Sequence, residues 1–578
     1  MRWLNTIFFV LCFGFFCSQN DSLHLKTWDQ LSLIPDSNNY NLFFGGPSSI
    51  YKSLYFKIED SPLLKNNPMF LKEQMDMPLL KFNLPVVDVQ YIIGDEQEQN
   101  LAIYHNQPIS ENSNYAISFL KRSHDGYYTN QSTNANFFQA HYSYKLPNKK
   151  YNIFSGLKHH RIFNEQNGGL VNDSSFSNTD WIFLNRLLLD VKMKNAYSND
   201  KLWKFFFNQS YQFKTVSDST FKKINFIDLN VNYSSKLRNY YDSLASDNFL
   251  YNYLDTLVTN DSINKNILSS EIKYRFEKIK DSIQTIFNIG WKSDFVSHLN
   301  LSIDTLLNNQ ALFTNYSKIS KNSSFLLSGK YFVLGFKSNN YEINLNGSKK
   351  LSEKIKIFTD IRFENNRPVF ELNNYSSNHQ KWNYSHDNTF LFSALGKLDV
   401  GPFSYTINYS EIKNPIYFDY VSHPVQFDGF TQVVQSKANY ELVRPKIYFL
   451  SEIIYQYQGG AQILQLPDWI GQLKFNYSLT HKKSNLKLTL GVNARCYSSF
   501  TLMSYSPSIN QFNITNQKKQ PAYFIADFIA KTMIKNVTVY AMVAHFNAGL
   551  MGSNYFTALN YPSPDRYIKF GLKWLFLN

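Results

Sequence analysis

Apolar and polar side chains alternate with a period of two along most of this chain, in segments of about 8–12 residues separated by polar loops. The clearest pair of such segments, residues 473–479 and 486–496, flanks a polar turn at residues 481–484. Each segment is long enough to cross a bilayer as a tilted β-strand. Beyond the first 20 positions, no stretch approaches the roughly 20 consecutive apolar residues that a spanning helix needs. The pattern therefore predicts an all-β protein and excludes a helical membrane protein.

Aromatic content and loop lengths favour a membrane barrel over a soluble sandwich. The chain has 578 residues, with 50 Phe, 40 Tyr and 8 Trp, which is too much apolar surface for a disordered chain. Aromatic residues crowd the segment ends, as at Tyr497 and Phe500, where a barrel places its interfacial girdles. Short turns alternate with longer polar loops at residues 164–179, 235–264, 364–386 and 498–520. We therefore predict a single transmembrane antiparallel β-barrel of roughly 16–20 strands, with short periplasmic turns and long extracellular loops.

The amino-terminal residues predict export. Arg2 precedes a short apolar segment at residues 7–16, so residues 1–19 are expected to form a signal peptide. Residues 20–85 are expected to form a periplasmic strap or a segment in the lumen, and residues 86–578 the barrel. The roughly 65 residues between signal and barrel are too few for the plug of a 22-stranded receptor energised from the inner membrane.

The carboxyl-terminal segment is the most diagnostic local feature. Its alternation places Ile568, Phe570, Leu572, Trp574 and Phe576 on one face, opposite Lys569, Gly571 and Lys573. A barrel strand that ends the chain on an aromatic residue resembles the terminal recognition signal of bacterial outer-membrane proteins. A soluble edge strand of this composition would be prone to aggregation. We therefore expect the barrel assembly machinery and outer-membrane lipid as partners.

The charge balance bears on the solute. Lys and Arg number 58 against 44 Asp and Glu, a formal net charge of +14. The basic side chains expected to line the lumen are Lys356, Arg362, Lys474, Lys487, Arg495, Lys569 and Lys573. Rings of Lys and Arg favour anions in pores, which predicts a preference for anionic solutes. The alternative is a compositional bias without selectivity, because acidic residues such as Asp360 and Glu364 offset the charge locally. No nucleic-acid partner is expected, since a secreted barrel meets little nucleic acid.

Several short blocks, in a fixed order, resemble one known family. The most specific is YSSNHQKWN at residues 375–383, where Asn378, His379 and Trp382 have the family's spacing. The other blocks are YNLFFGGP (40–47), PVVDVQYIIG (85–94), NEQNGGL (164–170), LQLP (464–467), YSP (505–507), YPSPDR (561–566) and GLKWLF (571–576). Along nearly its whole mature length the chain is similar to the "putative porin" family of Bacteroidota outer membranes. The resemblance implies a pore-forming β-barrel in the outer membrane of a Gram-negative bacterium, with no catalytic residues.

The sequence favours transport over catalysis. It has no nucleophile elbow, and His159, His160 and His379 lack partners at ligand spacing, so we expect no enzyme activity, metal or cofactor. His379 and Trp382 are expected to pack an outer loop against the barrel rim, with the imidazole bonded to loop carbonyls. The leading function is a porin through which small solutes diffuse, passively or under the control of its loops. The alternative is a non-conducting barrel that serves as a scaffold subunit of an outer-membrane complex. A homo-oligomer is compatible with both.

Overall fold

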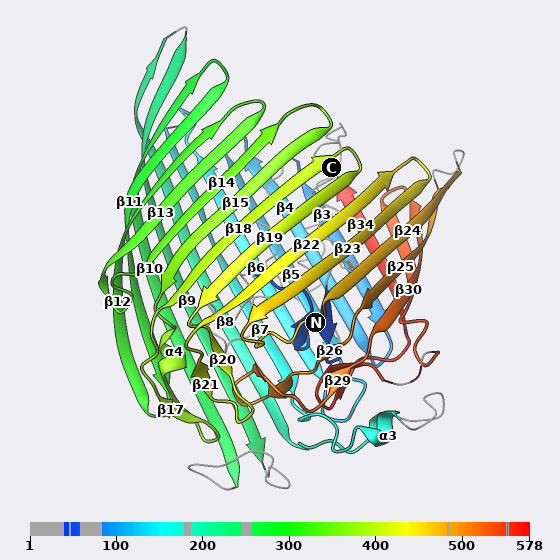
Figure 1. The fold of residues 1–578 in the computed structure, drawn as a ribbon. Helices are drawn as coiled ribbons and strands as arrows, with labels where there is room; N and C mark the ends of the chain where they lie inside the picture. The colour runs from blue at the N-terminus through cyan, green and yellow to red at the C-terminus, as the bar shows by residue number, and fades with distance from the viewer. Residues whose placement is uncertain are drawn as a thin grey trace, which may run out of the picture.

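The computed structural model describes residues 40–45, 48–57, 84–148, 150–177, 186–218, 220–243, 257–481, 486–550, 552 and 554–577. The expected signal peptide at residues 1–19 lies outside the described residues, as does most of the segment at 20–85. In the described part of the chain, 22 antiparallel strands close into one barrel (Figure 1). The predicted all-β class and single antiparallel barrel are confirmed.

The barrel strands follow one another in chain order, and each pairs with the next. They are β3 (Val86–Gly94), β4 (Glu98–Ser110), β5 (Ser113–His124), β6 (Thr133–Lys145), β7 (Tyr151–Glu165), β8 (Ala196–Ser217), β9 (Phe221–Ser243), β10 (Val258–Lys280), β11 (Ile283–Asn300), β12 (Ile303–Ile319), β13 (Ser323–Gly335), β14 (Tyr341–Lys350), β15 (Ile355–Asn366), β18 (Thr389–Val400), β19 (Phe403–Lys413), β22 (Phe430–Val443), β23 (Ile447–Gly460), β24 (Trp469–His481), β25 (Leu486–Tyr497), β30 (Tyr523–Ile534), β31 (Val537–Ala544) and β34 (Tyr567–Leu577). Pairing of β3 with β34 closes the ring.

The number of strands exceeds the roughly 16–20 expected from the sequence. Tight turns such as residues 111–112 and 281–282 leave little polar sequence between strands, so neighbouring segments merge in the alternation pattern. Residues 235–264, expected to be one long loop, instead include the ends of β9 and β10, which are 23 residues long each. Both strands are far longer than the 9–11 residues that cross a bilayer, and their polar ends conceal the strand pattern.

The two ends of the barrel differ in their connections (Figure 1). At one end, which we call the turn end, the strands are joined by short turns, and both β3 begins and β34 ends there. At the other end, which we call the loop end, lie the long connections, including residues 166–195, 367–388, 414–429, 498–522 and 545–566. This difference between the two ends matches the predicted alternation of short turns and long loops.

Short elements decorate the loop end. The helices are α3 (Ser174–Ser177) and α4 (Phe370–Asn373), and the strand pairs are β16 (Asn374–Ser376) with β17 (Lys381–Asn383), β20 (Ile416–Phe418) with β21 (Pro424–Gln426), β26 (Phe500–Thr501) with β29 (Lys519–Gln520), β27 (Ser504–Ser506) with β28 (Gln511–Asn513) and β32 (Phe556–Ala558) with β33 (Tyr561–Pro562). Among the described residues, no helix has the length and apolar character needed to span a membrane.

Alternate residues of each barrel strand face outward, and many of these are large and apolar. On β34 the outward side chains Ile568, Phe570, Leu572 and Trp574 are 38–53% exposed, and the ring of Trp574 stacks on Phe576 at 4.4 Å. Lys569 and Lys573 of the same strand face inward. The apolar outer surface is the kind that a lipid environment stabilises, whereas the inner wall is mostly polar.

Candidate functional site in the barrel lumen

An amino-terminal hairpin lies inside the barrel near the loop end (Figure 1). We call residues 40–45 and 48–57 the luminal hairpin; its strands β1 (Asn41–Phe43) and β2 (Tyr51–Ser53) pair with each other. Its carboxyl-terminal part is bonded to the inner wall. The side-chain nitrogen Nε2 of Gln435 donates to the carbonyl of Phe56 at 3.1 Å, and Nε2 of Gln456 donates to the carbonyl of Leu54 at 2.7 Å. Strands β22 and β23 therefore hold the hairpin by its backbone.

The opposite side of the luminal hairpin contacts the long loops. The ring of Phe44 stacks on Tyr561 at 4.2 Å and meets Tyr505 edge-on at 5.2 Å. The hydroxyl of Thr557 donates to the carbonyl of Phe43 at 3.0 Å. The buried apolar side chains of the hairpin are Leu42, Phe44, Ile50, Leu54 and Phe56. Each stabilises docking by about 1.5–3 kcal/mol, compared with about 1 kcal/mol for each hydrogen bond, so apolar burial dominates.

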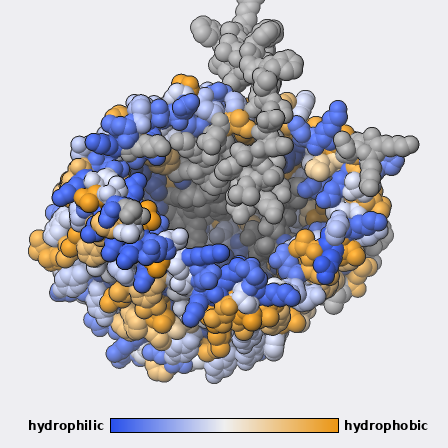
Figure 2. Space-filling model, turned by 90° about the horizontal axis from the view of Figure 1, so that it is seen from above, coloured by the Kyte–Doolittle hydropathy of each residue, from blue (hydrophilic) through white to orange (hydrophobic). Residues whose placement is uncertain are grey.

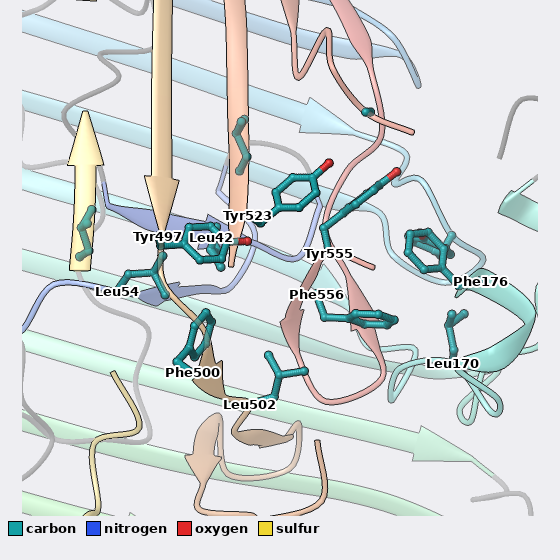
Figure 3. Packing of buried hydrophobic residues seen from close by; sticks show 14 of the residues in the cluster. Leu42, Leu54, Leu170, Phe176, Tyr497, Phe500, Leu502, Tyr523, Tyr555 and Phe556 are labelled. Carbon is teal, nitrogen blue, oxygen red and sulfur yellow. The ribbon is translucent and has the colours of Figure 1, made fainter. Parts of the chain in front are cut away.

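A large apolar cluster joins the luminal hairpin, the loops and the wall (Figure 3). Its members come from segments far apart in sequence and include Leu42, Leu54, Leu170, Phe176, Tyr497, Phe500, Leu502, Tyr523, Tyr555 and Phe556. Leu502, Tyr555 and Phe556 have no measurable exposure. The cluster lies within the ring of strands, so the loop end of the lumen is filled by protein on this side.

The long loops are also bonded to one another across the lumen. The backbone nitrogen of Ile514 donates to the carbonyl of Phe418 at 3.0 Å, and that of Leu559 donates to the carbonyl of Met503 at 2.9 Å. The side chain of Gln465 donates to the carbonyl of Thr515 at 2.6 Å. We call the luminal hairpin together with the described residues of loops 367–388, 414–429, 461–468, 498–522 and 545–566 the luminal plug.

The wall formed by β9 and β10 holds the far side of the luminal plug. Arg238, which is 1% exposed, pairs with Asp200 at 2.9 Å and also donates to the carbonyl of Pro507 at 2.9 Å. A guanidinium this deeply buried requires such partners, because an unpaired buried charge is costly. The plug is thus fixed at Arg238 on one wall and at Gln435 and Gln456 on another.

The block at residues 375–383 forms a second attachment to the same wall. His379 Nε2 lies 2.7 Å from a carboxylate oxygen of Asp242 and 2.9 Å from the hydroxyl of Thr259. The backbone nitrogen of Asn378 donates to Asp261 at 2.9 Å. The loop packs against the barrel as predicted. Nε2 of the imidazole meets a carboxylate and a hydroxyl of the wall, which sequence order alone did not indicate.

Glu371 of α4 adds an ionic contact to the same attachment. Its carboxylate pairs with the ammonium of Lys265 at 3.0 Å and with His298 Nδ1 at 3.1 Å. Burial alone would raise the pKa of Glu371, but the cation of Lys265 and the hydrogen bond from His298 outweigh burial and hold that pKa well below its ordinary value. The loop that carries α4 is therefore docked through an ionised carboxylate.

The predicted lumen-lining basic residues do face inward, but they do not form one ring. They lie on four strands: Lys356 and Arg362 on β15, Lys474 on β24, Lys487 and Arg495 on β25, and Lys569 and Lys573 on β34. Several have acidic neighbours: Arg362 with Asp360 at 3.0 Å, Arg495 with Asp527 at 3.8 Å, Lys569 with Glu98 at 2.7 Å and Lys573 with Asp88 at 3.7 Å. The cross-strand carboxylates were missed because strand neighbours are not known from sequence. The sequence did show that the carboxylates of β3, β4 and β30 occupy inward-facing positions of the alternating pattern.

A further set of ion pairs lies on the wall from β9 to β18, and apart from the local offset by Asp360 it was not predicted from the sequence. We call these pairs the ion-pair belt: Lys273–Glu271 (3.2 Å), Arg275–Asp228 (2.8 Å), Lys292–Asp294 (3.4 Å), Lys330–Glu342 (2.8 Å), Arg362–Asp360 (3.0 Å) and Lys397–Asp399 (3.0 Å). Their side chains keep 9–40% exposure. Seen from the turn end, the mouth of the barrel is hollowed and carries many hydrophilic residues (Figure 2).

In the described part of the chain, no three His, Cys, Asp or Glu side chains are grouped to hold a metal ion. The polar features of the lumen are ion pairs and hydrogen bonds. Their arrangement suits the passage or binding of polar solutes.

The model of the family described as "Putative porin" matches residues 23–578. The chain belongs to that family. No curated protein matches the chain by sequence.

Solved structures with a similar fold include several receptors. The ferric-catecholate import receptor Fiu of Escherichia coli K12 aligns with a TM-score of 0.60 at 10% identity, over 86% of this porin-family chain and 82% of the receptor. The siderophore receptor PirA of Acinetobacter baumannii gives 0.60 at 9% identity, over 86% and 81%. The ferripyoverdine receptor of the outer membrane of Pseudomonas aeruginosa gives 0.59 at 10% identity, over 86% and 72%. At this identity the likeness concerns the fold alone.

Proposed function

We propose that this member of the family is a transport channel of a Gram-negative outer membrane, through which small solutes pass when the luminal plug moves. The observation that carries the proposal is the division of one closed barrel into a packed loop end and a water-accessible, charged inner wall. Family membership and the apolar outer surface support a membrane-spanning channel. The proposal includes no catalytic step and no cofactor.

The proposal also gives the last strand a part in assembly. β34 closes the ring against β3 and presents apolar side chains on its outer face. The barrel assembly machinery and lipid are its proposed partners. A homo-oligomer or a larger outer-membrane complex is compatible with the same outer surface.

A receptor is the second candidate, and two observations favour it. The barrel has 22 strands, the number that the sequence argument associated with receptors, and its lumen contains an amino-terminal hairpin. The short amino-terminal segment was expected to be too small for the plug of a receptor. Here inward-folded loops pack together with the luminal hairpin, so the amino-terminal segment need not form a plug alone.

Swelling of liposomes tests the proposed function. Purified full-length protein is reconstituted, and swelling is followed in neutral sugars of increasing size. We expect slow swelling for wild type and faster, size-limited swelling for the double variant Gln435→Ala/Gln456→Ala, which loses the side-chain bonds to the hairpin backbone.

Other outcomes separate the alternatives. Saturable binding of one solute by wild type, with no size-limited swelling in either protein, supports a receptor. The absence of both, with partner proteins that co-purify, supports the scaffold and contradicts a channel. Heat-modified migration on a gel verifies that each variant has folded.

A further inference from the structure

The ion-pair belt lies on β9, β10, β11, β13, β14, β15 and β18, which follow one another around the ring except that β12 lies between β11 and β13. Its residues alternate along the strands with outward apolar side chains such as Trp291, Tyr331 and Phe363. The belt side chains occupy inward-facing positions of their strands and remain partly exposed to water. They therefore lie on the surface that a solute would meet inside the barrel. The belt therefore bears directly on what the lumen admits.

Each cation of the belt has a carboxylate close by on the same inner face. In four pairs the two charges lie two residues apart on one strand, as in Lys292–Asp294. In Lys330–Glu342 they lie directly across neighbouring strands. Arg275 contacts both Asp228 and Glu277. The belt therefore has no excess of positive charge, unlike the whole chain with its +14.

Paired charges act on a solute differently from a basic ring. The fields of two opposite charges about 3 Å apart largely cancel beyond the Debye length of about 8 Å, so neither sign of ion is attracted from a distance. At contact, however, the wall offers both an ammonium or guanidinium group and a carboxylate. A solute with both charges, or with several hydrogen-bonding groups, meets complementary partners at each step.

We infer that the ion-pair belt makes the lumen a path for zwitterionic and uncharged polar solutes, with little discrimination between small anions and cations. This inference rests on the proposed function, because it concerns what passes once the luminal plug moves. It differs from the anion preference predicted from the basic residues alone, because each cation of the belt has a carboxylate oxygen within 3.4 Å.

Reversal potentials in planar bilayers test the selectivity. The full-length protein and the double variant Gln435→Ala/Gln456→Ala are measured in a KCl gradient. We expect the permeability ratio of chloride to potassium to lie within about twofold of one. Glu342→Gln removes a carboxylate and should shift the ratio toward chloride, while Lys330→Met should shift it toward potassium. Lys321→Met, at an exposed turn outside the belt, is the matched control and should leave the ratio unchanged.

Swelling rates with glycine, sodium glycolate and ethanolamine hydrochloride test the solute class. Glycine should enter at least as fast as either ion. A permeability ratio that favours chloride or potassium by more than about tenfold would overturn the inference. So would an unchanged ratio in both belt variants, or entry of one charged probe faster than glycine. In each of these cases the protein would still be a working channel. No conductance and no swelling in any protein would instead overturn the proposed function.

Discussion

Two regions of the lumen are built from different interactions. At the loop end, the rings of Phe44, Tyr505 and Tyr561 pack with centroids 4.2–6.0 Å apart, and burial of apolar surface stabilises the plug. Along the ion-pair belt, side chains keep 9–40% exposure and are paired in contact with water. Closure and selectivity are therefore separable. Changes in the plug should alter flux, and changes in the belt should alter the kind of solute.

The largest effect is expected from Phe44→Ala. Removing a buried aromatic ring costs about 3–5 kcal/mol, which here is lost from docking of the luminal hairpin. Sugar entry into liposomes should become much faster while the permeability ratio stays the same. Phe43→Ala is the matched control, because the ring of Phe43 contacts Tyr51 within the hairpin and is only partly buried. Equal entry rates for the two variants would contradict the assigned role of Phe44.

A smaller effect is expected from His379→Ala. The variant leaves the carboxylate of Asp242 and the hydroxyl of Thr259 without the imidazole, at a cost of about 1–3 kcal/mol for docking of loop 367–388. Proteolysis of folded protein in detergent should then cleave this loop faster. His379→Gln keeps a donor and should recover part of the protection. If both variants are cleaved like wild type, the loop is held by other contacts.

Acid should weaken the same loop through Glu371. The pKa of Glu371 is held below its ordinary value of 4.5 in the docked loop, so its contribution to docking is complete above pH 4.5. That contribution declines as pH falls below 4.5, because the released loop then binds the proton more readily. Cleavage of loop 367–388 by an acid-active protease should rise below pH 4.5 in wild type. Glu371→Gln should remove most of this pH dependence, and an unchanged slope would contradict the ionised contact.

The smallest effect is expected from Lys52→Met in the luminal hairpin. Burial lowers the pKa of Lys52 from 10.5 to about 8, and its ammonium lies 3.4 Å from the carbonyl of Leu464. Lys52 loses its proton more readily in the docked hairpin than in the undocked hairpin. Docking should therefore strengthen as pH rises from about 8 to 10.5. Wild-type swelling should slow over that range, and Lys52→Met should show no such trend. A faster wild-type rate at high pH would contradict the sign.

The strand pattern predicted the barrel because a period of two survives wherever one face meets lipid. The pattern does not predict strands where they extend past the membrane. The ends of β9 and β10, for example, were expected to be loop. β34 was predicted from its alternating apolar side chains, whose outward faces are exposed in the folded barrel.

The candidate site was predicted less completely. The inward parity of Lys569 and Arg362 followed from strand alternation, but their ion pairs required knowing which strands lie side by side. Glu98 lies next to Lys569 only because the ring closes by pairing β34 with β3, which in turn pairs with β4. The contacts of His379 with β9 and β10 depend on a loop that folds across the lumen, and no local signal in the sequence reports that.

Cysteine accessibility tests the central claim most directly. In a Cys496→Ser background, Lys330→Cys places a thiol in the ion-pair belt and Leu502→Cys places one in the apolar cluster of the plug. Both are treated with a membrane-impermeant thiol reagent in folded, reconstituted protein. The separation of a packed luminal plug from a water-accessible belt predicts rapid labelling at position 330 and strong protection at position 502. Labelling of both positions at the same rate would contradict it.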